Sequence, residues 1–547
     1  MKNIKSNEVA VLVIGPFNEP FDYSIESEKN SVCIGQVVLV PFGKRKTVGI
    51  IVGEGTRTIP QEKLKRIDEI YELNPIPQSS IELINFLANW YCAYKGLVLK
   101  MVLSPVEAIT SPKYKKVYKS KFKDIEQIEA INTYKITSNR KIVLDFLLKS
   151  KQAVFPEDLI EKTGISRSIL RDMTKKNLIV EEMVKKQTNS NLKAFNYYKT
   201  KFENTKLLNA EQKKAVDKIN ISIKKQKSDC FLLDGVPGSG KTETYFQTVK
   251  ACLDEGKQIL ILLPEISLTP DWEKRFYQTF SFAPLVWHSG VTNTKKKQIW
   301  LSALNGSAGV VVGARSALML PISNLGLIIV DEEHEPAFKQ EEGVRYNARD
   351  MAIYKAIRSS APIVLASATP SLETFHNMKI GKYIHLTLPK RATGAALPDI
   401  KLIDLKVNTP ERGRWISSVL INEIKSKLDN REQSLLFLNR RGYAPLTICN
   451  SCGNKIKCVN CDTWLVEHRS QDILVCHHCG YKKRISNTCS ICGVEGQIKA
   501  CGPGVERIEE EINQLFPEAK LTVLSSDTMK SQKTLIKTLE NIKNNKV

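Results

Sequence analysis

The chain has 547 residues, of which 42% are hydrophobic and 25% are charged, fractions that are ordinary for a globular protein. No apolar run approaches the roughly 20 residues that span a bilayer, and the stretch "VAVLVIG" lacks a signal-peptide cleavage site, so the sequence predicts a cytoplasmic protein. Its 81 Lys and Arg against 58 Asp and Glu give a net charge of +23, which favours a polyanionic partner, although a generally lysine-rich composition would give the same excess.

The N-terminal region, residues 1–110, is predicted to be a β-rich domain. The stretches "EVAVLVIG", "GQVVLVPFG" and "TVGIIVGEG" are apolar and are separated by Gly and Pro, as is typical of short strands. A helical pattern follows in "SSIELINFLANWYCAYKGLVLKMVL".

Residues 111–204 are predicted to hold a basic linker followed by a winged-helix domain. Residues 140–182 contain three amphipathic runs, two of which are separated by the turn "TGIS". The helix after this turn is a candidate DNA-recognition helix, whose polar residues are Ser166, Arg167, Ser168 and Arg171. A three-helix packing module that does not touch DNA would show the same pattern.

From about residue 205, short apolar runs alternate with helical segments. The runs "CFLLDG", "QILILLP", "AGVVVG", "LGLIIVDEEH" and "PIVLASATP" end at Gly, Pro or polar residues. This alternation predicts an α/β fold, with a parallel sheet covered by helices on both faces. "QSLLFLNRRGYA" at residue 433 begins a similar pattern, which a cysteine-rich segment interrupts. We expect a first RecA-like ATP-binding lobe at 205–395, an incomplete second lobe at 396–445 and 500–547, and a cysteine-rich module at 446–499.

The stretch "GVPGSGKT" predicts a phosphate-binding loop, because it satisfies G-x-x-x-x-G-K-[ST] between an apolar strand and a helix. Glycines let backbone N–H groups and the helix N-terminus face phosphate oxygens. In such a loop the lysine reaches the β- and γ-phosphates and the threonine hydroxyl ligates Mg²⁺. The residues concerned are Gly235, Gly238, Ser239, Gly240, Lys241 and Thr242.

Two further features follow this loop in the order expected of a superfamily 2 helicase or translocase, and a third precedes it. Asp331 ends an apolar strand and can hold Mg²⁺, while Glu332 can polarise the attacking water; an acidic helix cap is the alternative. "SATPS" at 367–371 ends another strand, where it would couple nucleotide to nucleic acid. Gln212 lies where such enzymes read adenine, although an exposed helix face would look the same.

Eight of the 13 cysteines form four C-x-x-C pairs, and two such pairs complete a tetrahedral Zn²⁺ site. We therefore predict two structural zinc ions, with iron–sulfur ligation as the alternative. The predicted ligands are Cys449, Cys452, Cys458, Cys461, Cys476, Cys479, Cys489 and Cys492. His468, His477 and His478 lie nearby, but eight thiolates already fill both sites.

Together these features resemble the primosomal protein N′ family of replication-restart helicases over nearly the whole chain. A zinc-binding insert directly after "NRRGYA" is specific to this family. The other matching stretches are "LLPEISLTP", "HSG", "GARSAL", "DEEHEPAFKQEEGVRYNARD", "SATPSLET" and "CGPGVERIEEEI".

The resemblance implies a DNA-dependent ATPase that recognises branched DNA at stalled forks and moves 3′ to 5′ on single strands. Its implied partners are primosome proteins, the replicative-helicase loader and single-stranded-DNA-binding protein. The β-rich start resembles the family's 3′-end-binding domain, whose pocket residues map onto Asp22, Gly43 and Lys65. Without the resemblance, these would be two surface charges and a turn.

The resemblance also implies a DNA-coupling aromatic-rich loop and a pairing of the cysteines. The loop combines aromatic rings for base stacking with basic side chains for phosphates; its residues are Phe338, Lys339, Arg345, Tyr346 and Arg349. Val344 stands where some relatives have an aromatic residue. The outer pairs, Cys449/Cys452 and Cys489/Cys492, would share one zinc, and the inner pairs, Cys458/Cys461 and Cys476/Cys479, the other.

One departure from the family pattern concerns catalysis. The family's "GTQM…KG" and "GRAGR" motifs, of which the second carries the arginine that reaches the γ-phosphate, are absent from this sequence. Such an arginine contributes roughly 10³–10⁵ in rate at related sites. We therefore expect either a fragment of a longer motor or a catalytically weak fork-binding scaffold.

Overall fold

The computed structural model forms two units, residues 1–395 and 396–547, which are described separately. Several sequence stretches named above lie outside the described residues, among them 265–269, 439–445, His477 and 526–531. No helix in the part of the chain that the structure describes is long and apolar enough to cross a membrane. The described residues are 3–4, 6–25, 32–56, 60–106, 114–122, 137–150, 153–185, 208–264, 270–392, 394, 398–411, 414–438, 446–449, 451–461, 463–468, 473–476, 478–496, 498–501, 504–525 and 532–547.

The first unit begins with a five-stranded antiparallel sheet in the order β3-β2-β6-β5-β7, which confirms the predicted β-rich start. Alternate residues of its interior strand β2 enter different cores: Val9, Val11 and Val13 face one cluster, and Leu12 packs with the helices that follow. The elements are β1 (Asn3–Ile4), β2 (Glu8–Val13), β3 (Phe21–Ser24), β4 (Val32–Cys33), β5 (Val37–Phe42), β6 (Arg45–Glu54), η1 (Gln61–Lys63), β7 (Glu69–Ile70), α1 (Gln78–Trp90) and α2 (Lys95–Val102).

Three helices and a two-stranded antiparallel sheet follow, with a small core of their own. Gly164 ends the second of these helices in the left-handed conformation, at φ 69°. Ser166 occupies the N-cap position of α7, but its hydroxyl lies 2.7 Å from that of Ser168 and makes no capping bond. The elements are β8 (Tyr114–Ser120), α5 (Ser138–Ser150), α6 (Pro156–Thr163), α7 (Arg167–Lys175) and β9 (Ile179–Lys185).

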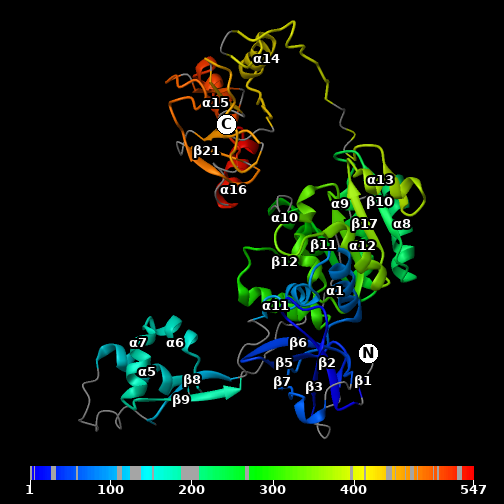
Figure 1. The fold of residues 1–547 in the computed structure, drawn as a ribbon, viewed down its shortest axis with the longest axis vertical. Helices are drawn as coiled ribbons and strands as arrows, with labels where there is room; N and C mark the ends of the chain where they lie inside the picture. The colour runs from blue at the N-terminus through cyan, green and yellow to red at the C-terminus, as the bar shows by residue number, and fades with distance from the viewer. Residues whose placement is uncertain are drawn as a thin grey trace. The chain divides into compact units, whose positions relative to one another are not determined.

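A seven-stranded, wholly parallel sheet in the order β12-β13-β11-β14-β17-β10-β18 confirms the predicted α/β lobe (Figure 1). Helices α8, α9 and α10 share one core with the sheet, and α11, α12 and η4 share the other. The strands are β10 (Cys230–Gly235), β11 (Gln258–Leu262), β12 (Leu285–Trp287), β13 (Val310–Gly313), β14 (Leu325–Asp331), β17 (Ile363–Ser367) and β18 (Ile384–Leu388). The helices are α8 (Ala210–Lys224), α9 (Lys241–Asp254), α10 (Pro270–Phe280), α11 (Asn293–Leu304), η4 (Arg315–Met319), η5 (Pro336–Phe338), α12 (Ala348–Arg358) and α13 (Leu372–Lys379).

The N-terminal domain and this lobe share one hydrophobic core. The ring of Phe86 on α1 stacks on that of Tyr354 on α12, with centroids 3.9 Å apart. The Trp300 indole on α11 donates a hydrogen bond to the Val102 carbonyl oxygen at 2.8 Å. Helices α1 and α2 of the N-terminal domain therefore pack against helices α11 and α12 of the lobe, between strands β2 and β14.

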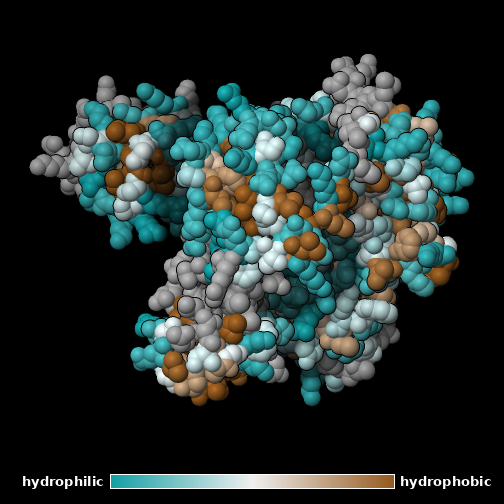
Figure 2. All heavy atoms as spheres, turned by 90° about the horizontal axis from the view of Figure 1, so that it is seen from above, coloured by the Kyte–Doolittle hydropathy of each residue, from teal (hydrophilic) through white to brown (hydrophobic). Residues whose placement is uncertain are grey.

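The described residues of the second unit form three helices and two small antiparallel sheets, with small hydrophobic clusters. The expected strand at residue 433 is wrong for the described residues 433–438, where Leu435 and Phe437 are each 85% exposed. A strand of a parallel sheet requires neighbouring strands and covered faces, and this unit supplies neither within its described residues. Figure 2 shows hydrophobic side chains, in brown, among the hydrophilic ones on the face that it displays. The elements are α14 (Ser418–Asp429), β19 (Leu446–Cys449), β20 (Val466–His468), β21 (Ile473–Val475), β22 (Lys482–Arg484), β23 (Ile498–Cys501), α15 (Val505–Leu515) and α16 (Gln532–Lys543).

Candidate nucleotide, DNA and metal sites

The glycine-rich loop joins the carboxyl end of β10 to the first turn of α9. Gly238 and Gly240 have φ values of 79° and 82°, which favour glycine. A Cβ on Gly235 would lie 2.5 Å from the Ser239 hydroxyl oxygen, so a side chain there would clash. Lys241 donates through Nζ to the Gly235 carbonyl oxygen at 2.8 Å. The loop thus has the curled backbone that exposes N–H groups and a helix N-terminus to an anion.

Gln212 is buried against this loop instead of lying on an exposed helix face. Its side chain forms a capping box with Asn209 at the start of α8. Its Nε2 also donates to the Ser239 carbonyl oxygen at 2.8 Å. The amide therefore holds the loop in this structure, and its contact with adenine stays a prediction.

The acidic pair lies at the same sheet edge, because β14 and β10 flank β17 and all three strands run parallel. Burial raises the pKa of Asp331 to about 6, while a hydrogen bond from the Tyr245 hydroxyl to Oδ2 at 2.8 Å lowers it. Glu332 has a φ of 49°, a strained conformation for a residue other than glycine. Thr242 is half-buried in the first turn of α9. This arrangement can hold a divalent cation beside a phosphate.

Glu333 and His334 connect these acids to the "SATPS" stretch, and the sequence reasoning missed both. His334 Nδ1 lies 2.8 Å from the Ser367 hydroxyl oxygen at the end of β17. The fully buried Glu333 carboxylate accepts hydrogen bonds from Ser371 N at 2.7 Å and from Thr374 Oγ1 at 2.8 Å. The sequence contains "DEEH" before "SATPS", but the spacing of these stretches does not show which side chains form hydrogen bonds with each other.

The aromatic-rich loop requires a correction. Phe338 and Tyr346 are 2% and 1% exposed and belong to the lobe core, so neither ring has a free face for a base. Arg349 is also buried and pairs with Glu333, at 3.1 Å between Nη1 and Oε2. Apolar rings in a loop are buried when the lobe offers them a pocket, and local sequence does not reveal that pocket. Lys339 and Arg345 are exposed.

The three residues proposed to bind a DNA end lie at different places in the N-terminal domain: Asp22 on β3, Gly43 before β6, and Lys65 between η1 and β7. Asp22 on β3 accepts hydrogen bonds from the backbone N–H, at 3.0 Å, and the hydroxyl of Thr56. Gly43 occupies the β5–β6 turn with a φ of 60°. Exposed Lys65 is joined to β3 through its carbonyl oxygen, which accepts from Ser24 N at 3.0 Å.

An exposed aromatic side chain adjoins Asp22, and the sequence analysis did not name it. The Phe21 ring, 36% exposed, packs edge-on against the Phe42 ring with centroids 5.1 Å apart. Phe17 lies 5.0 Å from the same Phe42 ring. The position of Phe21 in "FDY" beside Asp22 was the available signal. The Phe21 ring therefore joins β3 to the last residue of β5.

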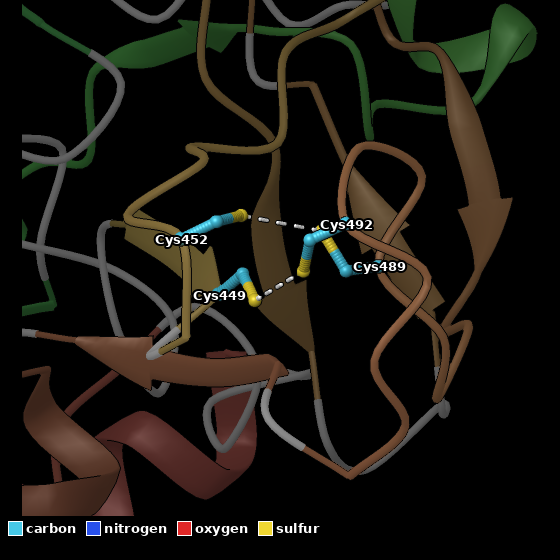
Figure 3. Close-up of side chains that lie close together, drawn as sticks. All are labelled: Cys449, Cys452, Cys489 and Cys492. Carbon is cyan, nitrogen blue, oxygen red and sulfur yellow. Dashed lines mark hydrogen bonds between the residues drawn. The ribbon is translucent and has the colours of Figure 1, made fainter.

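Eight cysteines form two groups, nested as the resemblance implies. Two Sγ–Sγ distances in the outer group (Figure 3) are 3.7 Å, two in the inner group are 3.4 Å, and all sulfurs of each group lie within 4.8 Å of one another. Thiolates bound tetrahedrally at about 2.3 Å from one zinc would be about 3.8 Å apart, so both groups fit that ion. The outer group is Cys449, Cys452, Cys489 and Cys492, and the inner group is Cys458, Cys461, Cys476 and Cys479.

Backbone N–H groups favour thiolates in both groups. Bonds from the Cys479 backbone and the Cys492 backbone lower the pKa of Cys476 and of Cys489, each to about 6. Gly453, at φ 70°, permits one of the tight turns that present the thiols. A soft, four-sulfur donor set of this kind suits zinc.

Comparison with known proteins identifies relatives over almost the entire chain. Three family models match: the PriA 3′ DNA-binding domain over 9–104, the DEAD/DEAH box helicase over 209–378, and the PriA DNA helicase Cys-rich region over 458–484. The replication restart protein PriA of Rickettsia felis is 37% identical over 527 residues, which cover 96% of this chain and 68% of the relative. For PriA of Haemophilus influenzae, identity is 34%, with 98% and 73% covered, and for PriA of Bacillus subtilis it is 30%, with 93% and 71% covered.

Proposed function

This chain belongs to the PriA family of replication restart proteins, and we propose from that premise that it is an ATP-dependent 3′–5′ DNA helicase. Its substrates would be stalled or branched replication forks, where it would initiate primosome assembly. The observation that carries the proposal is the meeting of the glycine-rich loop, Asp331 and Ser367 at one edge of the parallel sheet. Ligands of parallel sheets gather at this edge.

The roles at this edge follow from position and charge. Bound ATP with Mg²⁺ would supply the phosphoryl group and an electrophilic centre that neutralises phosphate charge. Lys241 would exchange its bond to the Gly235 carbonyl for the β- and γ-phosphates, and Thr242 and Asp331 would face the metal. Glu332 would accept a proton from the attacking water. Gln212, which already braces the loop, would present its remaining amide hydrogen toward adenine.

DNA contacts would come from two surfaces of the first unit. In the N-terminal domain, a 3′ end would be bound by Asp22, Gly43 and Lys65, with the exposed Phe21 ring available to stack on its base. Near the ATP site, exposed Lys339 and Arg345 would contact phosphates.

The cysteine groups would hold two structural Zn²⁺ ions, because their sulfur spacing and donor type fit that metal. We propose primosome proteins, the replicative-helicase loader and single-stranded-DNA-binding protein as partners, and a cytoplasmic location. The domain division would be 1–110 for DNA-end binding, 111–204 for the linker and winged helix, 205–395 for the first lobe, 396–445 with 500–547 for the start of the second, and 446–499 for zinc.

A catalytically weak fork-binding scaffold is the second candidate. The exposure of the apolar side chains of Leu435 and Phe437 in the second unit favours it. DNA-stimulated ATP hydrolysis by the full chain distinguishes the two functions, with Lys241→Ala as the blank. Turnover in the range of about 1–100 s⁻¹ would support the motor. Turnover indistinguishable from Lys241→Ala, with fork binding intact, would support the scaffold.

A further inference from the structure

Tyr245 links the ATP-site helix to the metal-binding strand. It lies four residues after Lys241 on α9, and its side chain is fully buried. Its hydroxyl donates to Asp331 Oδ2 at 2.8 Å. The same hydroxyl oxygen accepts a hydrogen bond from Trp272 Nε1, on α10, at 3.0 Å.

The direction of these two bonds is fixed by chemistry. An indole N–H can only donate, so the Tyr245 oxygen must accept from Trp272. The single phenolic hydrogen is then directed at Asp331, and a chain of hydrogen bonds polarises each of its members. A bond from a neutral hydroxyl to a carboxylate is also among the stronger kinds.

This chain of hydrogen bonds leaves the Asp331 carboxylate little orientational freedom. Its Oδ2 is held by Tyr245, and its Oδ1 accepts from Glu332 N at 3.1 Å. A ligand held before the metal arrives avoids the entropy cost of being ordered on binding. We propose that Tyr245 and Trp272 are positioning residues that orient Asp331 for Mg²⁺, an inference that rests on the proposed function.

Packing alone gives a competing account of Tyr245. Its ring lies edge-on to Phe246, with centroids 5.3 Å apart, and a buried hydroxyl needs some partner. Tyr245→Phe keeps the ring and removes only the hydroxyl. Trp272→Phe likewise keeps an aromatic ring where Trp272 now stacks on Phe276, at 5.4 Å, and removes the donor.

The test measures binding of a fluorescent, non-hydrolysable ATP analogue to the full chain, first in EDTA and then over a range of Mg²⁺ concentrations. For Tyr245→Phe we expect the analogue Kd in EDTA to stay within about twofold of the parent value, whereas the Mg²⁺ concentration that gives half-maximal tightening rises roughly threefold to tenfold. Trp272→Phe should shift the same midpoint in the same direction by a smaller factor. In an Asp331→Asn background, Tyr245→Phe should cause no further shift.

Tyr277→Phe is the matched control, because this tyrosine is on α10 but 56% exposed, and its midpoint should equal that of the parent. An unchanged midpoint in Tyr245→Phe, or a shift that persists in Asp331→Asn, would overturn the inference alone. If Tyr245→Phe does not fold, an unchanged midpoint in Trp272→Phe overturns it. A parent chain without Mg²⁺-dependent analogue binding would overturn the proposed function, and the inference with it.

Discussion

Lys355 on α12 is a fully buried lysine whose ammonium group is held by two backbone carbonyl oxygens. Its Nζ donates to the carbonyl oxygens of Leu318 and Leu320, each at 2.6 Å. Burial lowers the pKa of Lys355 to about 7, from 10.5. The unfolded chain therefore binds more protons than the folded chain between these two pH values.

From this we predict that the free energy of unfolding of the first unit rises as the pH increases from about 7 to about 10. One proton can contribute at most about 1.4 kcal/mol per pH unit, and below pH 7 the contribution to the slope disappears. Lys355→Met should flatten this rise, measured by urea unfolding at several pH values. Lys214→Met, which changes an exposed lysine on α8, should keep the parent slope. Parallel slopes for the parent and Lys355→Met would show that the ammonium is not desolvated as described.

At the scale of elements, the inner cysteine group holds the strands of the zinc module together. Cys476 follows β21 directly. Its group brings together the segment before β20, which holds Cys458 and Cys461, and the turn between β21 and β22, which holds Cys476 and Cys479. Cys476→Ala should lower the zinc content from two ions per chain to about one and expose β20–β22, because metal binding and folding are coupled in such modules. Cys92→Ala, outside both groups, should keep two ions. Two ions retained by Cys476→Ala, or an iron–sulfur absorption band in the parent, would contradict the assignment.

Elements differed in how far the sequence could predict them. The strands of the parallel sheet were predictable because both their faces are buried, which makes each run apolar from end to end. The segment 433–438 is similarly rich in apolar residues but lacks neighbouring strands in the described structure. Burial of Phe338 and the bonds of Glu333 to partners 16 to 41 residues away were not predictable, because tertiary packing decides them.

At the scale of the whole molecule, fork binding combines a charge term with an end-specific term. The net charge of +23 attracts any DNA and makes affinity fall with salt. The N-terminal domain, through Asp22 and Lys65, would act only on a strand terminus. A 3′-phosphate would place negative charge near the Asp22 carboxylate, so the parent chain should bind a 3′-phosphate fork more weakly than a 3′-hydroxyl fork.

We predict that Asp22→Ala removes most of this discrimination, which should be about tenfold or more in Kd if one charged hydrogen bond is involved. Titrations of both forks over a range of salt concentrations separate the two terms. Loss of one lysine–phosphate contact would lower the salt slope by only about 0.7–0.9, so Lys65→Ala should weaken binding of both forks while most of the slope remains. Lys46→Ala, which removes another exposed lysine of the same domain, should leave discrimination unchanged. Equal binding of both forks by the parent chain would leave charge as the whole basis of its DNA affinity.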